Sequence, residues 1–278
     1  MSGMAAAAEP IGSARGNLPA ALRRTWRAYR YWVTSYRRTW RGSVVSSIVN
    51  PVLYLAALGV GLGTLVHAGP ATHGLSYLQF IAPGLLAATA MQVASIEATY
   101  PVLASVKWVP MYDAMLATPL TVGDVFAGHL LWMLTRIGLT SSTYLAVIAA
   151  FGGVRSGLAV CAVPICLLLG LACAAPIAAF AVRQETDTSF SALQRFVIVP
   201  MFLFSGTFFS IDQLPSWIRP VAYVTPLWHG VTLTRDVTSG VMEPGGAVLI
   251  GVHLAFLAAL AGIGTCIAAR NYRRRLER

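Results

Sequence analysis

Apolar residues dominate six long stretches of the chain, and the short segments between them hold most of the polar residues. Each stretch is close to or above the roughly 20 residues that a helix needs to cross the hydrocarbon core of a bilayer. The pattern therefore predicts an all-α integral membrane protein with six transmembrane helices. The predicted spans cover residues 43–66, 77–104, 121–151, 157–182, 190–210 and 246–269.

The segment before the first span divides into two parts. Residues 1–18 mix small and polar residues without any period, which predicts a disordered N-terminal tail. Residues 19–41 repeat bulky side chains at spacings of three and four between arginines, which predicts an amphipathic helix at the membrane interface. The alternative is a soluble amphipathic helix packed on another domain. The predicted apolar stripe consists of Leu22, Trp26, Tyr29, Val33, Tyr36 and Trp40.

The segment after the fifth predicted span stays apolar but is interrupted by prolines. Tryptophan and tyrosine recur through residues 212–230, as they do where lipid meets water. We expect short re-entrant helices between spans five and six that close the outer end of a pathway as a gate. The side chains expected at helical spacing on one apolar face are Leu214, Trp217, Ile218 and Val221. The expected gate residues are Asp212, Leu214, Pro215, Trp217, Pro220 and Pro226.

Composition and charge support a membrane location. Only 11% of the 278 residues are charged, against about 25% in a typical soluble domain. The net charge is +10, but the arginines cluster beside apolar spans, which fits lipid headgroups and argues against nucleic acid as a partner. With the N-terminus inside, fifteen arginine and lysine residues fall in cytoplasmic segments and three in outer segments. This bias predicts a multi-pass protein of the cell membrane with both termini in the cytoplasm.

No motif for catalysis or for a bound metal stands out. The four cysteines lie in apolar runs without Cys-x-x-Cys spacing, and the histidines are scattered, so neither a metal site nor a cofactor is expected. The sole lysine, Lys107, does not follow a glycine loop, so the chain lacks the P-loop that an ATPase needs. We therefore predict that the chain is not an enzyme. ATP-driven transport would require a separate ATPase subunit.

Two motifs resemble those of one family of transporters. The first combines Phe-Leu-Phe-Ser-Gly-Thr-Phe-Phe at 202–209, Leu-Pro-Ser-Trp-Ile at 214–218 and Pro-Leu-Trp-His-Gly at 226–230, with Arg235 after them. The second consists of Gln92, Glu97 to Pro101 and Ala114 to Asp124. Together they resemble the permeases of type-2 ATP-binding-cassette (ABC) transporters, in the branch with nodulation-factor (lipo-oligosaccharide) and drug export permeases. The resemblance covers roughly residues 20 to 275.

The resemblance implies an architecture and a set of partners. A transmembrane permease domain would cover residues 43–278, and a cytoplasmic connecting helix would precede it at 19–41. The partners would be two copies of an ABC ATPase subunit and a second permease chain, expected as a homodimer, within the lipid bilayer. The exported cargo would be an amphiphile, either a lipo-oligosaccharide or other lipid-linked glycan, or a hydrophobic drug.

The loop after the second predicted span is where the ATPase would dock. Apolar side chains on a cytoplasmic loop suit insertion into a groove of a partner. In the resembled family this loop is the coupling helix that touches the ATPase, and Tyr112, Met115 and Leu116 are expected to face it. The alternative is a loop folded back on its own membrane domain. The predicted coupling residues are Trp108, Pro110, Tyr112, Asp113, Met115, Leu116 and Pro119.

Four polar side chains inside the predicted spans are functional candidates, since charge in the hydrocarbon region is costly unless it is paired. They are Glu97, His129, Arg136 and Arg195. Arg136 would lie about 22 Å from the inner end of its span and Glu97 only about 10 Å. Glu97 is therefore expected to pair with His129 or Arg195. A structural salt bridge and a contact with the cargo both remain open as its role.

Two other classes of function compete with an exporter subunit. An ion-coupled secondary transporter usually has several intramembrane acids and an inverted repeat. Here Glu97 is the one clear intramembrane acid, and no repeat is visible. An intramembrane lipid-modifying enzyme would need a convergent polar cluster near an interface, and the sequence shows none.

Overall fold

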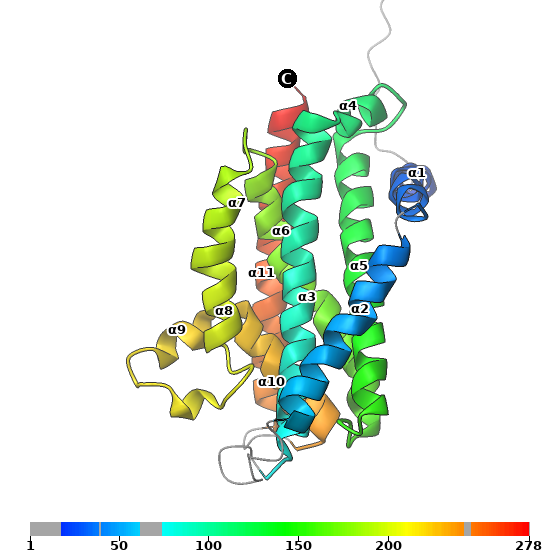
Figure 1. Ribbon diagram of the computed structural model, residues 1–278. Coiled ribbons are helices and arrows are strands. Elements are labelled where there is room, and N and C mark those ends of the chain that lie inside the picture. The colour runs from blue at the N-terminus through cyan, green and yellow to red at the C-terminus, as the bar shows by residue number, and fades with distance from the viewer. Residues whose placement is uncertain (1–17, 39, 62–73, 242–245, 278) are drawn as a thin grey trace, which may run out of the picture.

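The computed structural model forms every regular element as a helix within the residues it describes. Figure 1 shows long, roughly parallel helices gathered into a bundle, with shorter helices at its two ends. Most of the tail predicted at 1–18 lies outside the described residues. The described residues are 18–38, 40–61, 74–241 and 246–277.

The two ends of the bundle carry different elements. The short helix α4 (Met111–Leu116), the helix α1 (Leu18–Tyr36) and the C-terminal end of the chain lie at one end, drawn uppermost in Figure 1. We name this the inner end, after the predicted topology. The short helices α9 (Arg219–Val224) and α10 (Pro226–Ser239) lie towards the opposite, outer end.

Four helical stretches in the described part of the chain are long and apolar enough to cross a membrane. They correspond to the second, third, fourth and sixth predicted spans. The stretches are Tyr77–Trp108, made of α3 (Tyr77–Leu103) and the π-helical turn η4 (Ala104–Trp108); α5 (Val122–Ala150); Gly157–Ala181, made of the 3₁₀ turn η5 (Gly157–Cys161) and α6 (Ala162–Ala181); and α11 (Gly246–Leu276).

The first and fifth predicted spans form shorter apolar helices, Ile48–Ala57 and Thr188–Phe204. The fifth ends early because the chain turns at Gly206, whose φ of 77° is a conformation that side chains disfavour. Length and composition therefore support four of the six predicted spans. The elements involved are α2 (Trp40–Tyr54) with η1 (Leu55–Gly61), and α7 (Thr188–Leu193) with η6 (Gln194–Ile198) and α8 (Val199–Phe204).

Small residues bring the long helices close together. α6 packs against both α3 and α11, and alanines dominate the buried face of α6. A Cβ atom on Gly264 of α11 would lie 2.6 Å from Cδ of Pro176 on α6, so the two backbones nearly touch there. Such close approach lets dispersion and weak polar contacts hold membrane helices together. The interior of the bundle is consequently centred on α3 and α6.

The helix predicted at 19–41 is divided in two. α1 ends at Tyr36 and α2 begins at Trp40. α1 is seen nearly along its axis in Figure 1, so it runs across the upright α5 and packs one face on it. Leu22 and Trp26 of the predicted stripe remain exposed on the other side. An exposed leucine and tryptophan beside arginines suit a helix whose outer face meets the headgroup region.

Short helices occupy the outer segment, but its apolar side chains do not form the single helical face that was predicted. Leu214 has extended backbone, with φ −75° and ψ 147°, because the proline that follows disfavours the helical region. Regular helix resumes only at Arg219. As a result Leu214 is buried, whereas Trp217 and Val221 are exposed. The remaining element of this segment is the 3₁₀ turn η7 (Ile211–Gln213).

Candidate functional site

The loop between α3 and α5 is tied to two long helices by one tyrosine. Tyr112 of α4 is fully buried, and its hydroxyl lies 2.5 Å from Nδ1 of His129 on α5. The same hydroxyl lies 3.2 Å from the hydroxyl of Tyr272 on α11. Burial raises the pKa of Tyr112, so its hydroxyl keeps its proton. A displacement of α4 would therefore act directly on both α5 and α11.

Two of the residues expected to face a partner point into the protein instead. Tyr112 and Met115 are buried and Leu116 is half-buried, so their side chains fold back on the membrane domain, as the alternative for this loop predicted. The helical spacing does place them on one face, but burying that face in the bundle contributes about 1.5–3 kcal/mol for each large side chain. The predicted coupling residues that remain exposed are Trp108, Pro110, Asp113 and Pro119.

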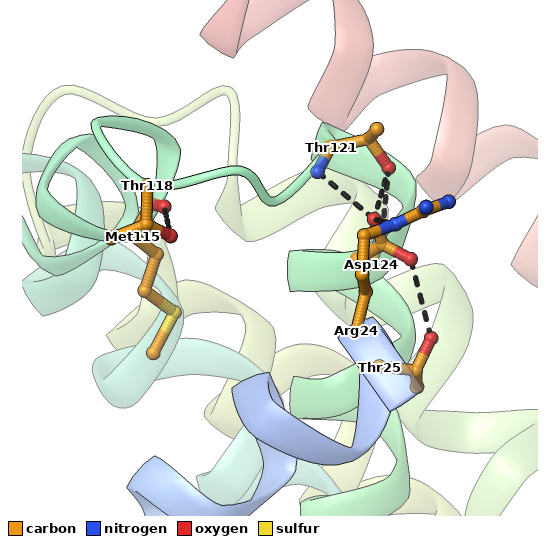
Figure 2. Close-up of polar contacts among 6 residues, drawn as sticks. All are labelled: Arg24, Thr25, Met115, Thr118, Thr121 and Asp124. Atoms are coloured by element: carbon orange, nitrogen blue, oxygen red, sulfur yellow. Dashed lines mark hydrogen bonds and ion pairs between the residues drawn. The ribbon is translucent and has the colours of Figure 1, made fainter. Parts of the chain in front are cut away.

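Hydrogen bonds fix the path of the chain from α4 into α5 (Figure 2). The Thr118 hydroxyl donates to the carbonyl oxygen of Met115 at 2.6 Å. Thr121 and Asp124 form a capping box, in which the Thr121 N–H donates to Oδ2 of Asp124 at 2.9 Å and the Asp124 N–H donates to the Thr121 hydroxyl oxygen at 3.2 Å. This arrangement satisfies the N–H groups of Thr121 and Asp124 and sets the direction in which the loop enters α5.

α1 joins α5 through contacts that recur every four residues along α1. Nε of Arg24 lies 2.9 Å from Oδ2 of Asp124, beside the capping box in Figure 2. Further along, Trp32 stacks on the His129 ring with centroids 3.9 Å apart. We call this set the α1–α5 seam. Its pairs are Arg24 with Asp124, Ala28 with Gly128, Trp32 with His129 and Tyr36 with Arg136.

Glu97 pairs with Arg136, which corrects the expectation that it would meet His129 or Arg195. Nε of Arg136 lies 2.9 Å from Oε1 of Glu97, and both side chains are mostly buried. The helix that carries Glu97 continues to Trp108, which places Glu97 about 16 Å from its inner end. Arg136 lies about 21 Å from the inner end of α5. An arginine side chain is long enough to span the difference in depth of about 5 Å between Arg136 and Glu97.

The ion pair forms part of the wall of a pocket of about 210 Å³. Polar groups from three helices line it, including Asn50 of α2, Gln92 of α3 and Thr140 of α5. Ionisable side chains that face a polar cavity between membrane helices are candidates for a functional role. Arg195, by contrast, is exposed and forms no ion pair within the described residues.

One arginine fixes the fold of the outer segment, and another holds the chain just before this segment against α10. The Arg219 guanidinium donates to the carbonyl oxygens of Asp212 at 2.6 Å and Leu214 at 2.9 Å. Arg235 donates to the carbonyl oxygen of Gly206 at 2.9 Å. Charged donors of this type make the stronger kind of hydrogen bond. Of the other predicted gate residues, Pro215, Trp217 and Pro220 are exposed and Pro226 is half-buried at the start of α10.

A cluster of charged side chains connects three elements at the inner end. Glu185, in the turn between α6 and α7, forms ion pairs with Lys107 of η4 and with Arg275 of α11. Hydrogen bonds first from Lys107 and then from Arg275 hold the pKa of Glu185 below its ordinary value of 4.5. Within the described part of the chain, no group of three or more His, Cys, Asp or Glu side chains could hold a metal ion.

Replacing Glu185 by glutamine should lower the melting temperature at neutral pH, because Lys107 and Arg275 lose the acid they share. The folded-state pKa of Glu185 is depressed, so its stabilisation is present above pH 4.5 and is lost as the pH falls through the folded-state value. Thermal unfolding in detergent across a pH series should show the wild type and E185Q converging in acid. A gap that stays constant at every pH would contradict this assignment.

Comparison with known proteins decides the family. Residues 23–238 match the model of the ABC-2 type transporter family. The chain belongs to this family. It is thus a transport permease with apolar helices, a multi-pass membrane protein and not an enzyme, and the resemblance seen in its two motifs is confirmed.

Related proteins align with most of the length of the permease. It is 30% identical over 253 residues to nodulation protein J of Rhizobium meliloti (strain 1021), which covers 88% of this chain and 94% of that protein. Nodulation protein J of Rhizobium leguminosarum bv. viciae is 31% identical over 255 residues, covering 89% and 95%. The inner membrane transport permease YadH of Escherichia coli (strain K12) is 23% identical over 231 residues, covering 81% and 86%.

Several residues that organise the site of this permease were not found from its sequence. Arg24, Trp32 and Tyr272 were not among the predicted site residues, and Tyr36 and Asp124 were placed only in the apolar stripe and in the second motif. Two signals could have found some of them. Thr121 followed by Asp124 three residues later is a capping-box pattern at a helix start. The residues of α1 at 24, 28 and 32 recur at the helical spacing of four, which marks a second face beside the aromatic stripe.

Proposed function

We propose that this ABC-2 permease exports an amphiphilic cargo and that a separate ABC ATPase docks on its inner loop to supply the energy. The observation that carries the proposal is the inner loop itself. Trp108 and Val109 are 55% and 59% exposed, directly before a helix whose Tyr112 is locked into the bundle. An exposed tryptophan and valine offer a partner the kind of apolar anchor that dominates binding energy. The buried tyrosine would pass the resulting displacement to α5 and α11.

The proposal includes a revised set of coupling residues. Trp108, Val109 and Pro110 form the exposed apolar surface, and Asp113 and Pro119 flank it. Tyr112 and Met115 act beneath this surface as the connection to the bundle. In the proposed topology this surface lies in the cytoplasm together with both termini, and α2 and the helix 188–204 complete six spans.

A second permease chain is proposed as the partner within the membrane. α2 and the helix 188–204 both carry exposed apolar side chains that another helix or lipid must cover. An apolar groove of about 610 Å³ runs between the helix 188–204 and α9, and Phe196, Val221 and Val224 are among its lining residues. Trp217, which is 76% exposed, stands nearby in the outer segment. The groove and this tryptophan would form the gate region that faces the cargo path or the second chain.

The contacts of the acidic residues disfavour ion-coupled transport. Within the described parts of the four long apolar helices the acids are Glu97 and Asp124, and each is ion-paired with an arginine. Neither is therefore free to load and release a coupling ion. Between the two cargo classes implied by the resemblance, the relatives named nodulation protein J favour a lipo-oligosaccharide.

Replacing Val109 and Trp108 by aspartate should release the ATPase while leaving the membrane fold intact. A charge placed in an apolar contact has no partner and costs at least about 2 kcal/mol, or roughly 30-fold in affinity. Affinity purification of tagged permease from native membranes, with the ATPase identified by mass spectrometry, measures the effect. T186D/T188D is the matched control, because Thr186 and Thr188 are both exposed at the inner end outside the loop. Full recovery of the ATPase with W108D/V109D would refute the docking site.

A further inference from the structure

We propose that the inner ends of α6 and α11 form a binding site for the phosphate of an anionic lipid headgroup. A pocket of about 290 Å³ opens there between the two helices. Arg183, directly after the C-cap of α6, lines one side, and Asn271, Arg274 and Arg275 of α11 line the other. This site is separate from the inner loop, and the proposal does not depend on the nature of the cargo.

The charges of the pocket are only partly balanced within the protein. Arg275 shares Glu185 with Lys107, whereas Arg183 and Arg274 form no ion pair with any residue that the structure describes. Two guanidinium groups therefore face one pocket with their donors available. A planar fork of donors matches phosphate oxygens in pairs, so a phosphate is the ligand that suits this pair best.

Packing between α6 and α11 holds the pocket in shape. The Asn271 side chain donates from Nδ2 to the carbonyl oxygen of Ala179 at 2.9 Å, two residues before the end of α6. Gly264 lies close against Pro176 further down the same contact. Packing of α6 on α11 fixes the backbone positions from which Arg183 and Arg274 reach into the pocket. Such preorganisation reduces the entropy lost on binding.

The depth of the pocket indicates that the phosphate belongs to a lipid. The apolar runs of α6 and α11 end at Val182 and Ala269, and arginines follow directly at 183 and 270. The pocket thus begins within about one helical turn, or ~5 Å, of the edge of the apolar region, where lipid phosphates lie. Basic pockets between helices at the cytoplasmic side of membrane proteins bind phosphate headgroups in this way. A soluble anion could share this chemistry, so the test separates the two sources.

The experiment measures lipid retention by purified permease in nanodiscs of phosphatidylcholine with added phosphatidylglycerol. Wild-type protein should retain phosphatidylglycerol in native mass spectra. The amount of phosphatidylglycerol bound to R183Q/R274Q should be at least tenfold lower than the amount bound to wild type. The matched control is R38Q/R273Q, which removes the same charge from exposed arginines outside the pocket and should retain the lipid. Inorganic phosphate in excess should not displace the lipid.

Three outcomes would overturn the proposal. Equal loss in R38Q/R273Q would mean that overall charge attracts the lipid. Competition by inorganic phosphate, or phosphate binding in pure phosphatidylcholine discs, would assign the pocket to a soluble anion. Unchanged lipid retention in R183Q/R274Q would mean that these two arginines do not bind the lipid. If the glutamine variant fails to fold, R183K/R274K serves as the second variant, because lysine keeps the charge but lacks the paired donors of the guanidinium group. It should still retain several-fold less lipid than wild type.

Discussion

Replacing Arg136 by alanine should destabilise the permease by about 3–5 kcal/mol, the cost of removing one partner from a buried ion pair. The change leaves the Glu97 carboxylate without its partner at 2.9 Å and also removes the contact of Arg136 with the Tyr36 hydroxyl at 2.7 Å. Equilibrium unfolding in mixed detergent micelles measures the loss. The double variant E97M/R136M removes both charges while keeping side-chain volume, and it should be clearly more stable than R136A.

Arg195 provides the control for this experiment. It is also an arginine of an apolar helix, but it is exposed and has no ion pair within the described residues. R195A should therefore change stability by no more than about 0.5 kcal/mol. If R136A and R195A behave alike, the Glu97–Arg136 pair contributes nothing to the fold. Its role would then have to be sought in the polar pocket beside it.

Replacing Gly84 by alanine should loosen the outer end of the permease. A Cβ atom there would lie 2.8 Å from the carbonyl oxygen and 3.1 Å from the Cα of Thr207. The backbone at Thr207, just before the outer segment, therefore has to shift. Overpacking of this kind costs about 1–3 kcal/mol. Hydrogen exchange in nanodiscs should rise across residues 205–214, and transport should fall if this segment forms the gate.

Gly251 is the matched control for the glycine experiment. It lies in α11, where an added methyl group would meet no neighbouring heavy atom of the described residues within 4 Å. G251A should leave exchange at the outer end unchanged, and alanine stabilises a helix by roughly 0.5–1 kcal/mol relative to glycine. Unchanged exchange in G84A would show that the segment is not held against α3 at this point.

The long apolar helices could be predicted from the sequence because their signal is local and strong. Spans two, three, four and six need only hydropathy and length, and the structure shows all four. The first and fifth lie at the limit of that signal. Where the helix at 188–204 ends depends on Ser205 and Gly206, which turn the chain back towards α3. The hydropathy of a stretch does not indicate where such a turn ends a helix.

The side-chain partners were harder to predict, because they depend on which face each helix turns to its neighbours. Helical spacing correctly grouped Tyr112 with Met115, but it could not tell whether that face meets a partner or the bundle. The predicted partner of Glu97 was wrong because the depth of Glu97 was counted from a helix end near 104. The π-helical turn extends this helix to Trp108. In the outer segment, Pro215 broke the helix on which the predicted face of Trp217 depended.

The α1–α5 seam has a thermodynamic consequence. His129 touches Trp32 of α1 on one side and Tyr112 of the inner loop on the other. A displacement of the loop that shifts this histidine therefore also alters the packing energy of α1 on α5. Reciprocity requires the coupling to be equal in both directions. If an ATPase docks on the loop as proposed and α1 lies at the membrane surface as predicted, the lipid composition around α1 should change the affinity of the loop for the ATPase by the same factor as the ATPase changes the affinity of α1 for the membrane.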